Sequence, residues 1–134
     1  MEHVAIVDPV YVWPILDGRK TIEARLTRSR REPWGSLRAG HTVYFKRRSG
    51  GYAAVARAAE VLRFTLPMEI TIERLRAVYG DAICADRGYW SAKAGARFAV
   101  LVRLADVRSV EAGPSLAGVK AGDRSAWRVV PVAA

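Results

Sequence analysis

The chain has 134 residues, the size of one domain, and we predict that residues 1–134 form a single domain whose core needs no disulfide or metal. It carries 22 Lys and Arg against 13 Asp and Glu, and a formal charge of +9 favours a polyanionic partner such as nucleic acid. No apolar run approaches the roughly 20 residues that span a bilayer, the N-terminus lacks a signal-peptide pattern, and the lone Cys84 has no internal disulfide partner. We therefore expect a cytoplasmic protein that contacts no membrane.

The first elements are a short strand and a broken helical segment. Residues 4–7 predict the strand, and Asp8 followed by proline is typical of a helix start. Because Pro14 removes a helical hydrogen bond, residues 10–17 form either two short turns or one kinked helix. Gly18 then suits a helix end or a tight turn.

The next stretch, ILDGRKTIEARL over residues 15–26, carries the functional argument. From Lys20 onward polar and apolar side chains alternate, which predicts a strand with one face in the core and one face available to a ligand. The apolar members are Ile22, Ala24 and Leu26, and the polar members are Thr21, Glu23 and Arg25. Glu23 and Arg25 can pair with each other or with a ligand.

Two basic groups follow. Residues 27–39 form a loop by composition, in which Arg28, Arg30 and Arg31 make a dense positive cluster with Arg25. A hairpin then joins a strand over residues 42–46 to a return strand from Tyr52 toward Phe64, through the turn sequence Ser-Gly-Gly. Lys46 and its two neighbouring arginines supply the second group at the turn.

The sequence of the C-terminal half predicts one helix and two strands. Thr71 caps a helix over residues 72–79 that Gly80 ends, residues 81–88 are irregular, and residues 89–93 form a short turn carrying Trp90. Strands over residues 98–107 and 126–130 complete the chain. We expect a mixed α+β, mainly β fold, a small closed barrel of about six strands with two or three short helices. Its hairpin-like connections argue against a parallel βαβ sheet.

Several enzyme classes are excluded. The sequence has no GxxxxGK[ST], GxGxxG or HExxH motif, and its two histidines and one cysteine do not suffice for an ordinary zinc site. Metal-independent chemistry without a cofactor remains, with Lys20, Thr21 and Glu23 as catalytic candidates, because a desolvated lysine beside a carboxylate is able to act as a general base. The alternative is a structural network in which Glu23 merely pairs with a cation.

The positions that resemble a known family are Gly18, Lys20, Glu23 and Arg25, which match the GxKxxExR signature of the ASCH (activating signal cointegrator homology) domain. The pair Tyr89-Trp90, followed by Lys93, the strand over residues 98–104 and Trp127, is also similar to the family's layout. The resemblance spans most of the chain. It implies a PUA-like β-barrel associated with RNA.

One ASCH branch deacetylates acetylated cytidine with a Lys, a Thr three residues later and a distant Glu. Lys20 matches that Lys, but Glu23 occupies the Thr position, Thr21 is displaced, and Glu73 is the candidate for the distant Glu. Other members are ribonucleases or nucleic-acid binders, and their Glu is matched by Glu23. The resemblance thus implies either activity without deciding between them.

Our first hypothesis is a module that binds single-stranded RNA or DNA in a basic cleft, with cations on phosphates, Glu23 on a base edge and an aromatic ring stacked on the base. Its binding residues are Lys20, Arg25, Arg28, Lys46, Tyr89, Trp90 and Lys93. The second is a metal-independent hydrolase of the same cleft, a ribonuclease or a modified-nucleoside amidohydrolase. A third is a protein-binding adaptor that uses the loop around Trp34.

Overall fold

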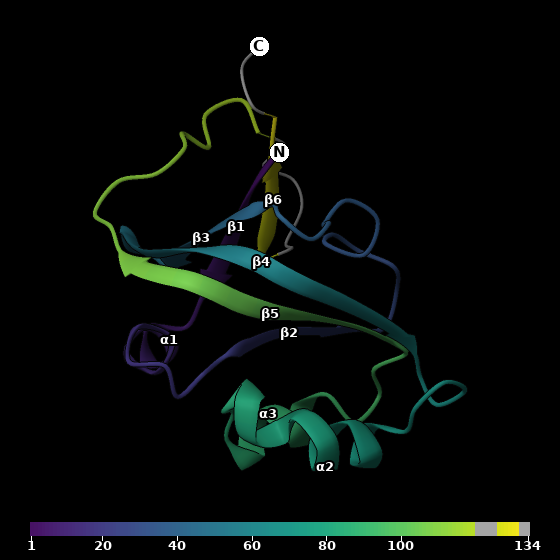
Figure 1. The fold of residues 1–134 in the computed structure, drawn as a ribbon. Helices are drawn as coiled ribbons and strands as arrows, with labels where there is room; N and C mark the ends of the chain where they lie inside the picture. Colours follow the sequence, from purple (N-terminus) through teal and green to yellow (C-terminus); the bar gives the residue numbers. More distant parts are fainter. Residues whose placement is uncertain (120–125, 132–134) are drawn as a thin grey trace.

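A computed structural model describes residues 1–119 and 126–131. Its single sheet has six strands in the order β2-β5-β4-β3-β1-β6 (Figure 1). The strands are β1 (Glu2–Val7), β2 (Ile22–Thr27), β3 (Thr42–Arg47), β4 (Tyr52–Thr65), β5 (Phe98–Ser109) and β6 (Trp127–Val130). The helices are the 3-10 helix η1 (Pro9–Tyr11), α1 (Val12–Leu16), α2 (Ile72–Ile83) and α3 (Arg87–Ala92). The predicted mainly β α+β fold is confirmed.

The sheet is mixed, which corrects the expectation of hairpin connections throughout. Strand β1 pairs with β3 in parallel, from Glu2 opposite Thr42 to Val7 opposite Arg47, whereas the other pairs are antiparallel. The chain between these parallel partners contains η1, α1 and β2, and β2 lies at the far edge of the sheet. The connection is therefore a crossover, and the two ends of the order, β2 and β6, are the edge strands.

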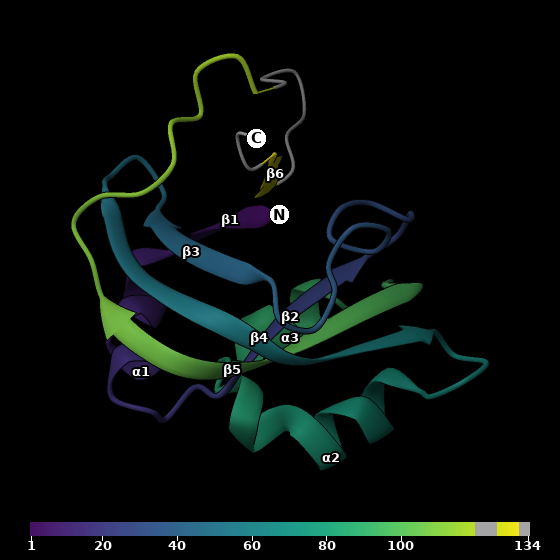
Figure 2. The same ribbon diagram turned by 45° about the horizontal axis from the view of Figure 1, so that its top comes forward.

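The long strands β4 and β5 bend the sheet into a half-barrel (Figure 2). Their pairing register shifts twice, between Val55 and Arg57 and between Ala58 and Glu60. Such irregularities increase local twist and curvature. The bend brings the edge strand β2 round toward β1, so that the sheet ends face each other across a seam without a strand pair between them.

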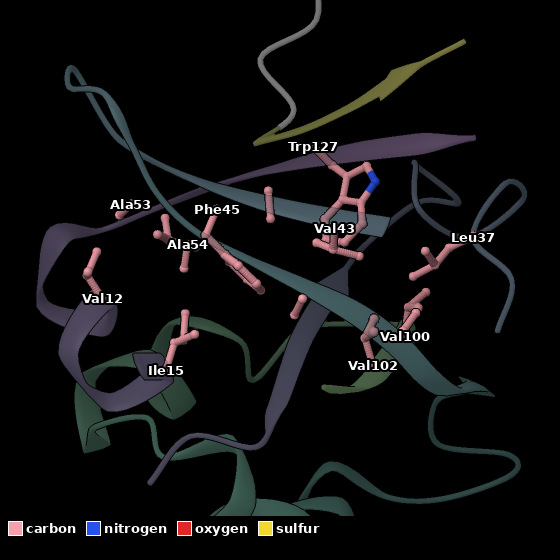
Figure 3. Close-up of a cluster of buried hydrophobic side chains, with 14 residues drawn as sticks. Val12, Ile15, Leu37, Val43, Phe45, Ala53, Ala54, Val100, Val102 and Trp127 are labelled. Carbon is pink, nitrogen blue, oxygen red and sulfur yellow. The ribbon is translucent and has the colours of Figure 1, made fainter. Parts of the chain in front are cut away.

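Two buried clusters hold the fold together. The first fills the curve of the half-barrel, where Phe45 and Trp127 are its largest fully buried side chains (Figure 3). The second lies between the sheet and the helices α2 and α3, and it contains the alternating residues Ile22, Ala24 and Leu26 of β2. The apolar face of β2 is thus buried as its alternation predicts.

The helices differ from the sequence prediction in two places. Helix α2 continues through Gly80 to Ile83 and ends at Cys84, which has left-handed backbone angles (φ 56°, ψ 44°). The reason is packing, because Ile83 is buried in the second cluster and Gly80 lies against the ring of Trp90. Within the segment predicted to be irregular, Asp86 accepts a hydrogen bond from the Tyr89 amide and begins α3.

The N-terminal helical segment resolves into the two short turns allowed by the sequence, η1 and α1. No helix in the described part of the chain is long and apolar enough to cross a membrane.

Candidate functional site

A cavity of about 370 Å³ opens at the seam between β2 and β1, and we call it the seam cavity. Its walls come from β2, from the end of β1 and the turn after it, from α3 and from the start of β6. Its lining residues are Ile6, Val7, Asp8, Tyr11, Glu23, Ala24, Arg25, Leu26, Thr27, Arg31, Glu32, Arg48, Tyr89, Lys93, Ala126 and Trp127. Charged groups of both signs and three aromatic side chains therefore surround one space.

Arg25 crosses the seam. Its guanidinium donates hydrogen bonds to the carbonyl of Ala126 at 3.2 Å and to the carbonyl of Ile6 at 3.3 Å, and it lies 5.3 Å from the ring centroid of Trp127. The side chain therefore connects β2 to the other end of the sheet, where backbone pairing does not. It forms part of the cavity wall in a fixed position.

Glu23 places a buried carboxylate in the seam cavity. The residue is only 6% exposed, and one oxygen, Oε1, accepts from the Ala24 amide at 3.1 Å and lies 3.7 Å from Nε of Arg25. The other oxygen, Oε2, has no hydrogen-bond partner among the described residues. A buried acceptor without a partner costs free energy, on the order of 1–3 kcal/mol, and a ligand donor at this point relieves that cost.

Tyr89 and Lys93 form the α3 side of the seam cavity. The Tyr89 hydroxyl donates to the carbonyl of Ala24 at 3.3 Å, and burial, followed by the charge of Glu23, raises the pKa of Tyr89 well above its ordinary value. Burial and the nearby Arg25 lower the pKa of Lys93, whose ammonium lies 5.7 Å from the Tyr89 ring centroid. Both groups are thus partly desolvated, and the charge of Glu23 acts on Tyr89 while that of Arg25 acts on Lys93.

A second cavity of about 280 Å³ adjoins the first, and we call it the loop cavity. It is lined by Leu26, Thr27, Arg28, Ser29, Arg31, Ala92, Lys93 and Ala96. Four residues, among them Arg31 and Lys93, line both spaces. The two cavities are therefore neighbours along β2 and the loop that follows it.

A comparison with solved structures finds this fold in an ASCH protein from Zymomonas mobilis, with a TM-score of 0.64 and 18% identity, covering 81% of this chain and 69% of that one. Two single-residue variants of that protein match with TM-scores of 0.63, at 18% and 17% identity, and cover 82% and 81% of this chain and 75% and 70% of theirs. The chain has the ASCH domain fold. No protein-family model and no curated protein matches the sequence.

Only half of the ASCH-like signature reaches the seam cavity. Glu23 and Arg25 line it, whereas Gly18 forms the preceding turn with φ 85°. Lys20 is only 4% exposed, its ammonium donates to the carbonyl of Ile83 at 2.6 Å, and it lies 5.2 Å from the ring centroid of Tyr11. Lys20 therefore does not line the cavity but lies next to Tyr11, which does.

The structure separates several other predicted site residues from the seam cavity of this ASCH fold. Thr21 is exposed and precedes β2, Lys46 lies on β3, and neither lines a described cavity. Trp90 is buried in the second cluster with the guanidinium of Arg76 over its ring. Arg28 lines the loop cavity.

Sequence reasoning did not assign Tyr11, Arg48 or Trp127 to a site, although all three line the seam cavity. They come from three separate segments that the parallel pairing of β1 and β3 brings together. Two advance signals existed, the place of Arg48 in the basic group before the hairpin turn and the place of Trp127 in the ASCH-like layout. In residues 1–119 and 126–131, no three His, Cys, Asp or Glu side chains gather as metal ligands do.

Proposed function

We propose that this chain binds single-stranded nucleic acid, with RNA as the first candidate, and that one unpaired base enters the seam cavity. The observation that carries the proposal is the buried carboxylate of Glu23, whose Oε2 has no partner among the described residues and which lines an open space. Amino and imino groups on base edges are donors that such an oxygen accepts.

The walls of the cavity suit a base. Tyr11, Tyr89 and Trp127 offer aromatic surface, and stacking on such rings accepts any base because every base has a π face. A base that enters a cavity has to leave its duplex stack, which favours a single strand. The hydrogen bonds from Arg25 to two backbone carbonyls fix the position of its side chain next to Glu23, so the cavity is formed before the ligand arrives.

The charge distribution supports a polyanion. Arg25, Arg31, Arg48 and Lys93 line the seam cavity, and the whole chain carries +9. Each neutralised phosphate of a single strand contributes about −0.7 to the slope of log affinity against log salt. The ASCH resemblance of the β2 motif, which implies association with RNA, agrees with this distribution.

The test is a titration of fluorescent oligoribonucleotides at several salt concentrations, with the variant Glu23→Gln. We expect steep salt dependence and, for the variant, affinity weaker by about tenfold or more, because a charge-assisted hydrogen bond is lost. The matched control is Glu73→Gln, which changes an exposed glutamate on α2 that lines neither cavity. Affinity that does not depend on salt, or equal effects of the two variants, would contradict the proposal.

A second candidate function is metal-independent hydrolysis of RNA or of a modified nucleoside in the same cavity. The observation that favours it is that Lys93, whose pKa is lowered by burial and by Arg25, lines the same cavity as the buried carboxylate of Glu23. A lysine and a carboxylate that line one cavity suit general acid–base catalysis. Incubation of RNA, the matching DNA and acetylated cytidine with EDTA present tests this function. Product formation that Lys93→Met abolishes supports it, and an inert protein removes it.

A further inference from the structure

The loop cavity differs from the seam cavity in its charge. The seam cavity carries the acidic groups Asp8, Glu23 and Glu32 beside its cations, whereas the loop cavity is lined by cations without any carboxylate. The cations of the loop cavity are Arg28, Arg31 and Lys93. None of these three forms an ion pair with a described carboxylate, so their charge is uncompensated within that part of the chain.

The loop itself holds Arg31 in position, and a glycine outside the loop leaves room for Arg28. Nε of Arg31 donates to the Ser29 hydroxyl at 3.2 Å, and the Thr27 hydroxyl donates to the carbonyl of Ser29 at 2.7 Å. The guanidinium of Arg28 lies against Gly95, where an added Cβ would come within 2.8 Å of it. The glycine therefore leaves room for the Arg28 guanidinium at the edge of the cavity, and the loop rather than a carboxylate positions Arg31.

We propose that the loop cavity is a phosphate site. It binds the phosphate of the same nucleotide whose base occupies the seam cavity. Three uncompensated cations with hydroxyl groups between them match a phosphate, and the fork of a guanidinium donates hydrogen bonds to two phosphate oxygens at once. Lys93 lines both spaces, so it is placed to join base and phosphate recognition. This inference rests on the proposed function and adds the place where the phosphate next to the bound base is held.

The experiment compares ligands with and without a phosphate by NMR titration of the full chain. The probes are the four ribonucleosides, their 5′- and 3′-monophosphates, and inorganic phosphate. We expect at least one monophosphate to bind about tenfold more tightly than its nucleoside, which is the order expected for one charge-assisted contact. The variant Arg28→Gln should lose that advantage and keep the affinity for the nucleoside, because Arg28 lines the loop cavity and not the seam cavity.

The control is Arg74→Gln, which removes an exposed arginine of α2 that lines neither cavity. Equal affinity for nucleoside and nucleotide, or the same loss in the control as in Arg28→Gln, overturns the phosphate site and leaves the assignment of the seam cavity unaffected. Inorganic phosphate that shifts Arg28 and Arg31, while no nucleotide binds more tightly than its nucleoside, assigns the site to free phosphate and also overturns the proposal. If no nucleoside or nucleotide shifts Glu23 or Tyr89, the proposed function itself fails.

Discussion

His3 is a fully buried histidine, 0% exposed, and both of its ring nitrogens form hydrogen bonds. The indole N–H of Trp127 donates to Nδ1 at 3.0 Å, so Nε2 carries the proton and donates to Nδ1 of His41 at 2.9 Å. The same His41 nitrogen accepts from the Arg38 amide at 3.2 Å. This chain of bonds requires a neutral His3, since a proton on Nδ1 would remove the acceptor of the Trp127 indole.

The pH dependence of stability follows from this arrangement. Burial, then His41 and the amino terminus, lower the pKa of His3 from 6.5 to about 4. Between pH 6.5 and about pH 4 the unfolded chain binds more protons than the folded chain. The contribution of His3 to the free energy of unfolding is therefore fully present above pH 6.5 and is lost as the pH falls through this range, by about 3 kcal/mol in all. Urea unfolding at pH 7, 5.5 and 4 measures it.

The variant for comparison is His3→Asn, because the asparagine oxygen is still able to accept from Trp127 but does not titrate. Its loss of stability between pH 7 and pH 4 should be smaller than that of the unchanged chain by about the same 3 kcal/mol. Identical losses in the two proteins would contradict a neutral buried His3.

At the scale of elements, Lys20 connects the start of β2 to the end of α2. The last carbonyls of a helix have no partner within it, and the helix dipole makes that end negative. The ammonium of Lys20 binds the Ile83 carbonyl at 2.6 Å, and the Thr21 amide donates to the Ala82 carbonyl at 2.9 Å. This placement gives Lys20 a structural role at the helix end.

We therefore predict that Lys20→Met lowers the free energy of unfolding by about 1–3 kcal/mol, because it leaves a buried carbonyl without a donor. Affinity for the ligand, measured on the folded fraction, should stay the same. Arg19→Met is the control, since its side chain is exposed and its ion pair with Asp17 lies at the surface. A stable Lys20→Met protein without ligand binding or turnover would restore Lys20 to the functional site.

The sequence predicted the strands and helices that bury one face, but it did not predict where they end or which elements pack beside them. The alternation along β2 placed Ile22, Ala24 and Leu26 in the core because the period of a strand is a local property. The end of α2 depends on the burial of Ile83, a contact that Gly80 does not signal. Tyr89 and Trp90 are adjacent on a helix and point about 100° apart, so only one of them faces the cavity.

At the scale of the whole molecule, the site exists because the half-barrel leaves a seam. The parallel pairing of β1 with β3 puts β1 near the edge opposite β2, and no local pattern in the sequence indicates that pairing. Arg25 then bridges the seam through two carbonyls. The sequence marked Glu23 and Arg25 as candidates, but their partners across the seam depend on the topology.

Arg25→Lys should weaken the closure of the seam while keeping the charge. A lysine lacks the planar fork that reaches both carbonyls, so we predict a loss of about 1–3 kcal/mol in unfolding free energy, as for hydrogen bonds from a charged group. Arg103→Lys is the control, because its ion pair with Glu60 is exposed on β5. Equal unfolding midpoints and slopes in urea for both variants would contradict a bridging role.

The most direct test of the central claim is an NMR map of the chain during titration with a short single-stranded oligoribonucleotide. We predict saturable shifts at Glu23, Arg25, Tyr89 and Lys93, which line the seam cavity, and none at the exposed Arg57 and Arg103 of β4 and β5. Shifts concentrated on β4 and β5, or no saturable shift at Glu23, would contradict the assignment of the seam cavity as the nucleic-acid site.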